Sequence, residues 1–275
     1  MGRIIEFEVP AAPTLFSPLQ VHPRQLLHLT MSGWNVWVRE HLFSHQRLIR
    51  EHNTSVVITG IHARYVEPFG FFDGEALRGE TSVRVRKGGK LLETATRFTS
   101  GGRTAALVTL LLRAVLIGDP ASLAATSGDI PMGLLERFLP DEIDERPLAR
   151  AVAPLLTRIE ETGKLLAEDF YTFTLPRDMV EFADQWMFSE LPVLCARSRE
   201  KMTLARAEKL PALVQGIANP IERLDAELLR PFFLYDEGTI TTRAYDCDGH
   251  LAVVHHLHGT GHEAEMVRAT LIEQF

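Results

Sequence analysis

One short pattern occurs twice in the chain, and this duplication constrains the fold more than any other feature. The first copy reads PFGFFDG at residues 68–74, and the second reads PFFLYDEG at residues 231–238. Glycine-containing turns at 87–91 and 100–102 recur in the same order at 247–251 and 260–262, and FEVP at 7–10 resembles FTLP at 173–176. Chance similarity between ordinary hairpins is the alternative. The constant order favours two units built on one plan.

Each copy shows the same succession of hydrophobic patterns. The first predicts a strand at 4–9, a long and largely enclosed helix at 25–51, and strands at 55–65, 75–86, 90–100 and 104–117. The second predicts a strand at 171–175, a helix at 179–206, a short helix within 208–229, and hairpins about 248–249 and 260–261. Between them lies a proline-rich stretch with one helix near 149–166. We therefore expect an α+β chain with an N-terminal unit at 1–117, a linker at 118–168 and a C-terminal unit at 169–275.

The charge and the cysteine content exclude several classes of protein. The 36 acidic and 29 basic residues give a formal charge of −7, whereas a general nucleic-acid binder needs a basic face. Two cysteines cannot build a disulfide framework. Acidic residues interrupt the first ten positions, unlike a signal peptide, and the apolar run at 105–117 is shorter than the roughly 20 residues of a membrane helix. We expect a cytoplasmic protein without a nucleic-acid or membrane partner.

A long enclosed helix wrapped by a strongly bent antiparallel sheet resembles the hotdog fold, and two such units resemble a double hotdog. The residues that carry this resemblance are the helix around 34–53, the bend at Phe72-Asp73 and the strands up to 117, with 186–202 and 235–272 in the second copy. The sequence pattern of hotdog dehydratases is absent. The His-x-Asn-Asn segment of many hotdog thioesterases has only a degenerate counterpart at residues 32–35.

The resemblance implies a function as well as a fold. Hotdog proteins process acyl thioesters of coenzyme A or acyl carrier protein, so we expect hydrolysis or transfer of such an acyl group, in fatty-acid or polyketide-type biosynthesis. A dehydratase or decarboxylase and a non-catalytic acyl-binding scaffold are the alternatives. In these families the N–H groups at the start of the central helix polarise the thioester carbonyl. No metal is implied, and no cofactor beyond the coenzyme A or phosphopantetheine of the substrate. Since one chain already pairs two units, it would act as a monomer or as a homodimer.

Thioester hydrolysis needs a carboxylate that acts as base or nucleophile in a partly dry site, together with donors for the oxyanion. The first predicted helix offers these groups. We assign Glu40 as the base with His41 beside it, and Asn35 and the backbone amide of Gly33 as donors to the carbonyl. The alternative is a solvated helix edge, with Ser32 as the cap of the helix.

The expected substrate-binding residues lie on the same helix and on the first hairpin. Arg86 and Lys87 belong to a basic hairpin that suits a phosphate of the carrier, although such charges are also ordinary on a soluble hairpin. The complete set is Ser32, Gly33, Trp34, His45, Arg86 and Lys87.

Three further groups have structural explanations beside functional ones. Asp73 and Asp236 recur at the two bends, where turn chemistry explains an aspartate better than catalysis does. Asp184 and Glu190 are expected on the second long helix and are reserve candidates for the carboxylate. The histidines at 255, 256, 258 and 262 resemble metal ligands, but neighbours along a strand point to opposite faces, so a polar sheet face is the simpler interpretation.

Overall fold

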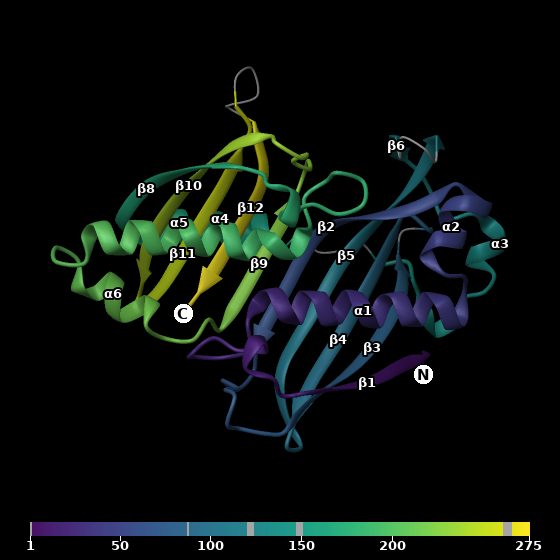
Figure 1. Cartoon of the computed structure of the whole chain (residues 1–275), viewed down its shortest axis with the longest axis horizontal. Coiled ribbons are helices and arrows are strands. Elements are labelled where there is room, and N and C mark those ends of the chain that lie inside the picture. The colour runs from purple at the N-terminus through teal and green to yellow at the C-terminus, as the bar shows by residue number, and fades with distance from the viewer. Residues whose placement is uncertain (1, 87, 120–123, 147–150, 261–265) are drawn as a thin grey trace. The chain divides into compact units, whose positions relative to one another are not determined.

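The computed structural model describes residues 2–86, 88–119, 124–146, 151–260 and 266–275. The chain divides into two compact units, Met1–Ala149 and Arg150–Phe275. Residues 118–149 of the expected linker belong to the first unit, and residues 150–168 belong to the second. Each unit contains five neighbouring antiparallel strands with a long helix across them (Figure 1).

The first unit packs helix α1, Pro23–His41, against a sheet with the strand order β1-β3-β4-β5-β2. The strands of this sheet are β1 Ile4–Pro10, β2 Thr54–Tyr65, β3 Ala76–Arg86, β4 Leu91–Ser100 and β5 Arg103–Asp119. The smaller elements are the 3-10 turns Pro13–Leu15 and Pro140–Glu142, helices α2 His45–His52 and α3 Met132–Leu135, and strands β6 Ala124–Ser127 and β7 Ile143–Asp144.

The second unit packs helix α5, Leu191–Arg206, against a sheet with the order β8-β10-β11-β12-β9. Its strands are β8 Lys164–Thr174, β9 Arg223–Leu228, β10 Glu237–Cys247, β11 His250–His258 and β12 Val267–Gln274. Helices α4 Val152–Thr162 and α6 Pro211–Ile217 and the 3-10 turns Arg177–Met179 and Phe188–Glu190 complete it.

Both units follow one topology. Along the chain, the long helix of each unit follows its first strand and precedes its second strand. Across the strands of each unit, the first strand stands at one end of the order, and the second strand stands at the other end, next to the last strand. The repetition predicted from the sequence is therefore confirmed, and each unit has the hotdog architecture.

Apolar packing fixes the long helices on their sheets. In the first unit Trp34 and Trp37 are fully buried, and a Cβ at Gly33 would collide with the side chain of Thr81, so the helix lies closer to β3 than a larger residue would allow. In the second unit Val253 packs with residues of α5 and α6, whereas Val254 packs with α4. Because neighbours on a strand point to opposite faces, α4 covers the face opposite α5.

Hairpins are confirmed where the sequence predicted them. Gly88 and Gly89 have φ of 57° and 91°, and Asp248 and Gly249 have φ of 56° and 86°. This left-handed backbone is the one that two-residue turns between twisted strands require. The turn expected about residues 260–261 lies partly outside the described residues.

The long helices differ from the expectation at their ends. The helix predicted at 25–51 is two helices, because the backbone of Leu42 leaves the helical region and the hydroxyl of Ser44 accepts a hydrogen bond from the backbone N–H of Arg47 to start α2. The helix predicted at 179–206 begins at Leu191 instead. Before it, Asp184 has a φ of 54°, which a continuing right-handed helix cannot contain.

Basic side chains of α5 cover the outer strand of the second sheet. Strand β8 ends the strand order of its unit. The Nζ of Lys201 donates to the backbone oxygen of Phe170 at 2.6 Å, and the guanidinium of Arg206 donates to that of Glu168. These bonds attach the last turns of α5 to the strand.

Candidate active site

The residues expected on the first helix divide between two faces of α1. Gly33 and Trp34 face the sheet and are buried, whereas Ser32, Asn35 and Glu40 are exposed. Since α1 begins at Pro23, Ser32 lies inside the helix, and the interpretation of Ser32 as its cap is wrong. The structure thus does not gather the expected donors and base on one face.

The three expected catalytic side chains have ordinary surroundings. The amide of Asn35 donates to the backbone oxygen of Met31 at 3.1 Å, within its own helix. The carboxylate of Glu40 is 47% exposed and lies 3.9 Å from the guanidinium of Arg39. Burial and the charge of Arg3 lower the pKa of His41. The assignment of Glu40 as base stays a prediction, without a dry environment to support it.

His45 and Arg86 have partners inside the protein. The ring of His45 stands edge-on to Trp34 with centroids 5.3 Å apart, its Nε2 lies 2.9 Å from the hydroxyl of Ser55, and burial lowers its pKa. Arg86 pairs with Glu93 at 2.8 Å and with Asp144 at 3.0 Å. Two carboxylates therefore already balance its charge.

The rest of the basic hairpin is only partly described. Lys87 lies outside the described residues. Arg97 pairs with Glu80 at 2.7 Å, and Arg84 is exposed. The substrate-binding role expected for this hairpin stays a prediction.

The repeated aspartates serve their turns. The carboxylate of Asp73 accepts the backbone N–H of Gly70 at 2.6 Å, and that of Asp236 accepts the backbone N–H of Phe233 at 3.0 Å. Asp236 also pairs with Arg268 at 3.0 Å. The interpretation of both residues as turn formers is confirmed.

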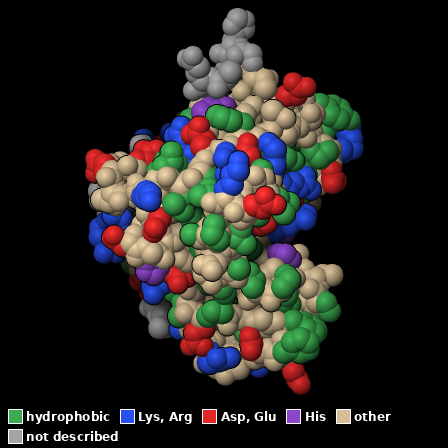
Figure 2. Space-filling view, turned by 90° about the vertical axis from the view of Figure 1, so that its left-hand side faces the viewer, with side chains coloured by type: hydrophobic (Ala, Val, Ile, Leu, Met, Phe, Trp, Pro, Cys, Tyr) green, Lys and Arg blue, Asp and Glu red, His purple; other side chains and the backbone are tan. Residues whose placement is uncertain are grey.

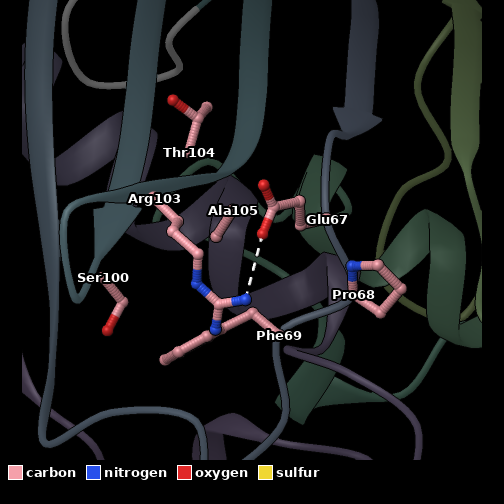
Figure 3. A pocket seen from close by; sticks show the side chains of 7 residues that line it. All are labelled: Glu67, Pro68, Phe69, Ser100, Arg103, Thr104 and Ala105. Atoms are coloured by element: carbon pink, nitrogen blue, oxygen red, sulfur yellow. Dashed lines mark hydrogen bonds and ion pairs between the residues drawn. The ribbon is translucent and has the colours of Figure 1, made fainter.

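A shallow hollow lies beside the first bend (Figure 3). It contains about 170 Å³ of empty space, including solvent at its mouth, and the ion pair between Arg103 and Glu67 at 3.1 Å crosses it. Its lining residues are Glu67, Pro68, Phe69, Ser100, Arg103, Thr104 and Ala105. The hydroxyl of Ser100 donates to the backbone oxygen of Ala76 at 2.6 Å and Glu67 is paired with Arg103, so the hollow presents no serine activated by a base.

The histidines of β11 point to two faces, as alternation along a strand requires. His255 is fully buried beneath α5, whereas His256 contacts the hydroxyl of Thr270 at 3.1 Å and its ring centroid lies 6.4 Å from that of His258. His262 lies outside the described residues. Among the residues that the structure describes, no three His, Cys, Asp or Glu side chains gather as a metal site.

The start of α5 offers a buried carboxylate. Glu190 is the residue that precedes the helix, and only 2% of it is exposed. The partial positive charge of a helix N-terminus favours an anion at this position. Asp184, the other reserve candidate, is exposed in the preceding loop. Of all the carboxylates singled out from the sequence, Glu190 therefore best meets the need for a dry site at the start of a helix.

A buried hydrogen-bonded network extends beneath the same helix, and the sequence analysis missed it. Ser198 of α5 lies 2.6 Å from the hydroxyl of Thr242, which lies 2.9 Å from Nδ1 of His255. Nε2 of His255 lies 3.3 Å from the carboxylate of Glu273, which also binds the guanidinium of Arg199. The network connects α5 with β10, β11 and β12.

The end of this network that contains Arg199 and Glu273 is charged. Burial raises the pKa of Glu273, but the charge of Arg199 and the hydrogen bond from His255 outweigh it and lower the value to about 2. Burial lowers the pKa of His255, so its imidazole is neutral at neutral pH. Burial and the nearby Glu273 raise the pKa of the Cys195 thiol well above its usual range, which makes this cysteine a poor nucleophile.

Two further observations concern the charges on the surface and the apolar length of the helices. On the face shown in Figure 2, acidic and basic side chains are interspersed among hydrophobic ones. Within the described parts of the chain, no helix combines the length and the apolar composition that crossing a membrane requires.

Comparison with solved structures finds the same fold in three other proteins. No family model matches the sequence, and no curated protein matches it. A protein assigned as an oleoyl thioesterase from Lactobacillus plantarum superposes with a TM-score of 0.73 at 8% identity, over 99% of this chain and 96% of the other. An acyl-ACP thioesterase from Bacteroides thetaiotaomicron superposes with a TM-score of 0.64 at 11% identity. The 12:0-ACP thioesterase from Umbellularia californica superposes with a TM-score of 0.66 at 9% identity, and each match covers 98% of this chain and 96% of the other. These likenesses confirm the double hotdog fold.

Proposed function

We propose that the chain hydrolyses acyl thioesters of coenzyme A or acyl carrier protein. The observation that carries this proposal is the likeness in fold, along nearly the whole chain, to three proteins named as acyl thioesterases. Under the proposal the acyl group comes from fatty-acid or polyketide-type synthesis, and the pantetheine arm enters as part of the substrate. Fold alone does not fix chemistry, so the proposal also needs a reacting group.

Glu190 is the reacting group that we propose, because it is a buried carboxylate at the start of a long helix. It takes a proton from a water molecule, and the resulting hydroxide attacks the thioester carbonyl. Pro192 has no N–H and the N–H of Leu191 donates to the backbone oxygen of Phe188, so the backbone N–H of Val193 is the group of the first turn of α5 that stabilises the oxyanion. The C–S bond then breaks, the thiolate takes the proton from Glu190, and the fatty acid and the free thiol leave.

The assignment made from the sequence is the rival within the same function. There Glu40 is the base, and Asn35 and the Gly33 amide are the donors. The two candidates lie in different units, so one pair of matched variants separates them.

The experiment measures release of free thiol from acyl-CoA and acyl carrier protein thioesters of increasing chain length, with mass spectrometry of the products. Glu190→Gln is expected to lower kcat by about 100-fold or more, the scale of a lost general base. Glu40→Gln is expected to leave kcat unchanged. The reverse result favours Glu40. Turnover without thiol release indicates a dehydratase or decarboxylase, and binding without turnover indicates an acyl-binding protein; either result refutes the proposed function.

A further inference from the structure

The second unit buries an ion pair that its fold does not require. The side chains of Arg199 and Glu273 are 10% and 1% exposed, and they bind each other between α5 and the sheet. The first unit builds the contact of α1 with its strands without a charged side chain from the helix, and its own buried carboxylate, Glu142, pairs instead with Arg3 just before β1. The buried residues of α1 are Leu26, Leu27, Thr30, Gly33, Trp34, Trp37 and Val38, and the buried polar residues of the strands in this unit are threonines and serines.

Stability alone does not explain such a pair. Two charges that leave water lose hydration, and apolar residues of similar volume often stabilise a protein equally well or better. The first unit shows that apolar residues, threonines and serines suffice where the long helix contacts its strands. The ion pair therefore calls for an explanation beyond holding the unit together.

The hydrogen bonds of the network attach α5 to its strands in one defined orientation. Apolar contacts are non-directional and tolerate small slides of a helix, whereas hydrogen bonds at fixed angles do not. Two consecutive residues of α5 take part: Ser198 contacts Thr242 of β10, and Arg199 binds Glu273 of β12. Attachment to two strands at once fixes both the rotation of the helix and its position along its axis.

We propose that Arg199 and Glu273 are positioning residues, which hold α5 in the register that places Glu190 at the thioester. This inference rests on the proposed function. Glu190 lies nine residues before Arg199, about 14 Å along the helix at 1.5 Å per residue. A shift of α5 by one residue would move Glu190 by about 1.5 Å, and a displacement of about 1 Å can lower a rate by roughly 100-fold.

The test removes both charges while it keeps the packing and one hydrogen bond. In the full-length double variant Arg199→Met/Glu273→Gln, the glutamine still offers a partner to His255. We expect kcat for thioester hydrolysis to fall at least tenfold with KM within threefold of the wild type, because binding surfaces stay while the register loosens. The single variant Arg199→Lys keeps the charge but loses the planar fork, so its kcat is expected between those of the wild type and the double variant.

The matched control is Arg223→Met/Asp225→Asn, which removes an ion pair of 2.5 Å on β9 in the same unit. Its kcat is expected to equal that of the wild type. A folded double variant with wild-type kcat, or a loss carried by KM alone, overturns the inference. If the double variant does not fold, Arg199→Lys decides: a lower kcat at unchanged melting temperature supports the inference, and an unchanged kcat overturns it. A wild type that hydrolyses no acyl thioester refutes the proposed function instead, and the inference with it.

Discussion

Removal of one partner from the buried ion pair should destabilise the second unit strongly. In Arg199→Met the carboxylate of Glu273, which is 1% exposed, stays buried without its cation. Breaking a buried pair in this way typically lowers the free energy of unfolding by 3–5 kcal/mol. The lowered pKa of Glu273 points in the same direction. The difference between the usual 4.5 and about 2 corresponds to about 3 kcal/mol.

The same pKa predicts a dependence on pH. Because folding lowers the pKa of Glu273, its contribution to stability is complete above pH 4.5 and disappears as the pH falls to about 2. In Arg199→Met the pKa of Glu273 rises, since its main stabilising charge is gone. The gap in unfolding free energy between wild type and variant should therefore be about 3–5 kcal/mol at pH 7 and should narrow as the pH falls from the raised pKa of Glu273 in the variant to about 2, its pKa in the wild type.

Urea unfolding at several pH values measures the difference in unfolding free energy between the wild type and Arg199→Met. Hydrogen exchange of peptides from α5 and β12 shows whether the loss of stability lies in the second unit. The double variant Arg199→Met/Glu273→Gln is the control, because it leaves no unpaired charge and should recover most of the stability. The reasoning is refuted if the single variant loses less than about 1 kcal/mol at pH 7, or if the double variant is no more stable than the single one.

Two further predictions concern packing and turns. Gly33→Ala should lower the free energy of unfolding by about 1–3 kcal/mol, because the added methyl group collides with Thr81; an unchanged melting curve would contradict the close approach of α1 to β3. Asp73→Ala should lose about 0.5–1.5 kcal/mol with its one backbone hydrogen bond, and Asp236→Ala should lose more, because it also ends the ion pair with Arg268. Equal losses at the two bends, measured by urea unfolding, would contradict this ranking.

Much of the fold was predictable from local signals. The alternating strands and the glycine turns at 88–89 and 248–249 are patterns within a few residues, and they appear in the structure as predicted. The ends of the long helices were not predictable in the same way. Trp186 and other apolar residues continue a helical pattern before Leu191, but the backbone there forms an isolated bridge between Val180 and Trp186 instead.

The site was less predictable, because its residues are far apart in sequence. Arg199 and Glu273 are 74 positions apart, and no spacing rule connects them. One signal was present: Glu273 directly follows Leu271 and Ile272, and a charge at the end of a buried strand needs a partner. Conversely, the basic hairpin looked free because the carboxylate of Asp144 reaches Arg86 from a segment that the sequence analysis treated as linker.

The basic side chains of α5 that bind β8 affect how the molecule behaves at high concentration. An outer strand exposes backbone groups on which another chain can add as a further strand, the first step toward a fibre. Lys201 and Arg206 occupy backbone oxygens of this strand and place two positive charges beside it. An incoming strand would have to displace both, so the sheet resists growth at β8. The last two turns of α5 thus protect the chain from self-assembly through this strand.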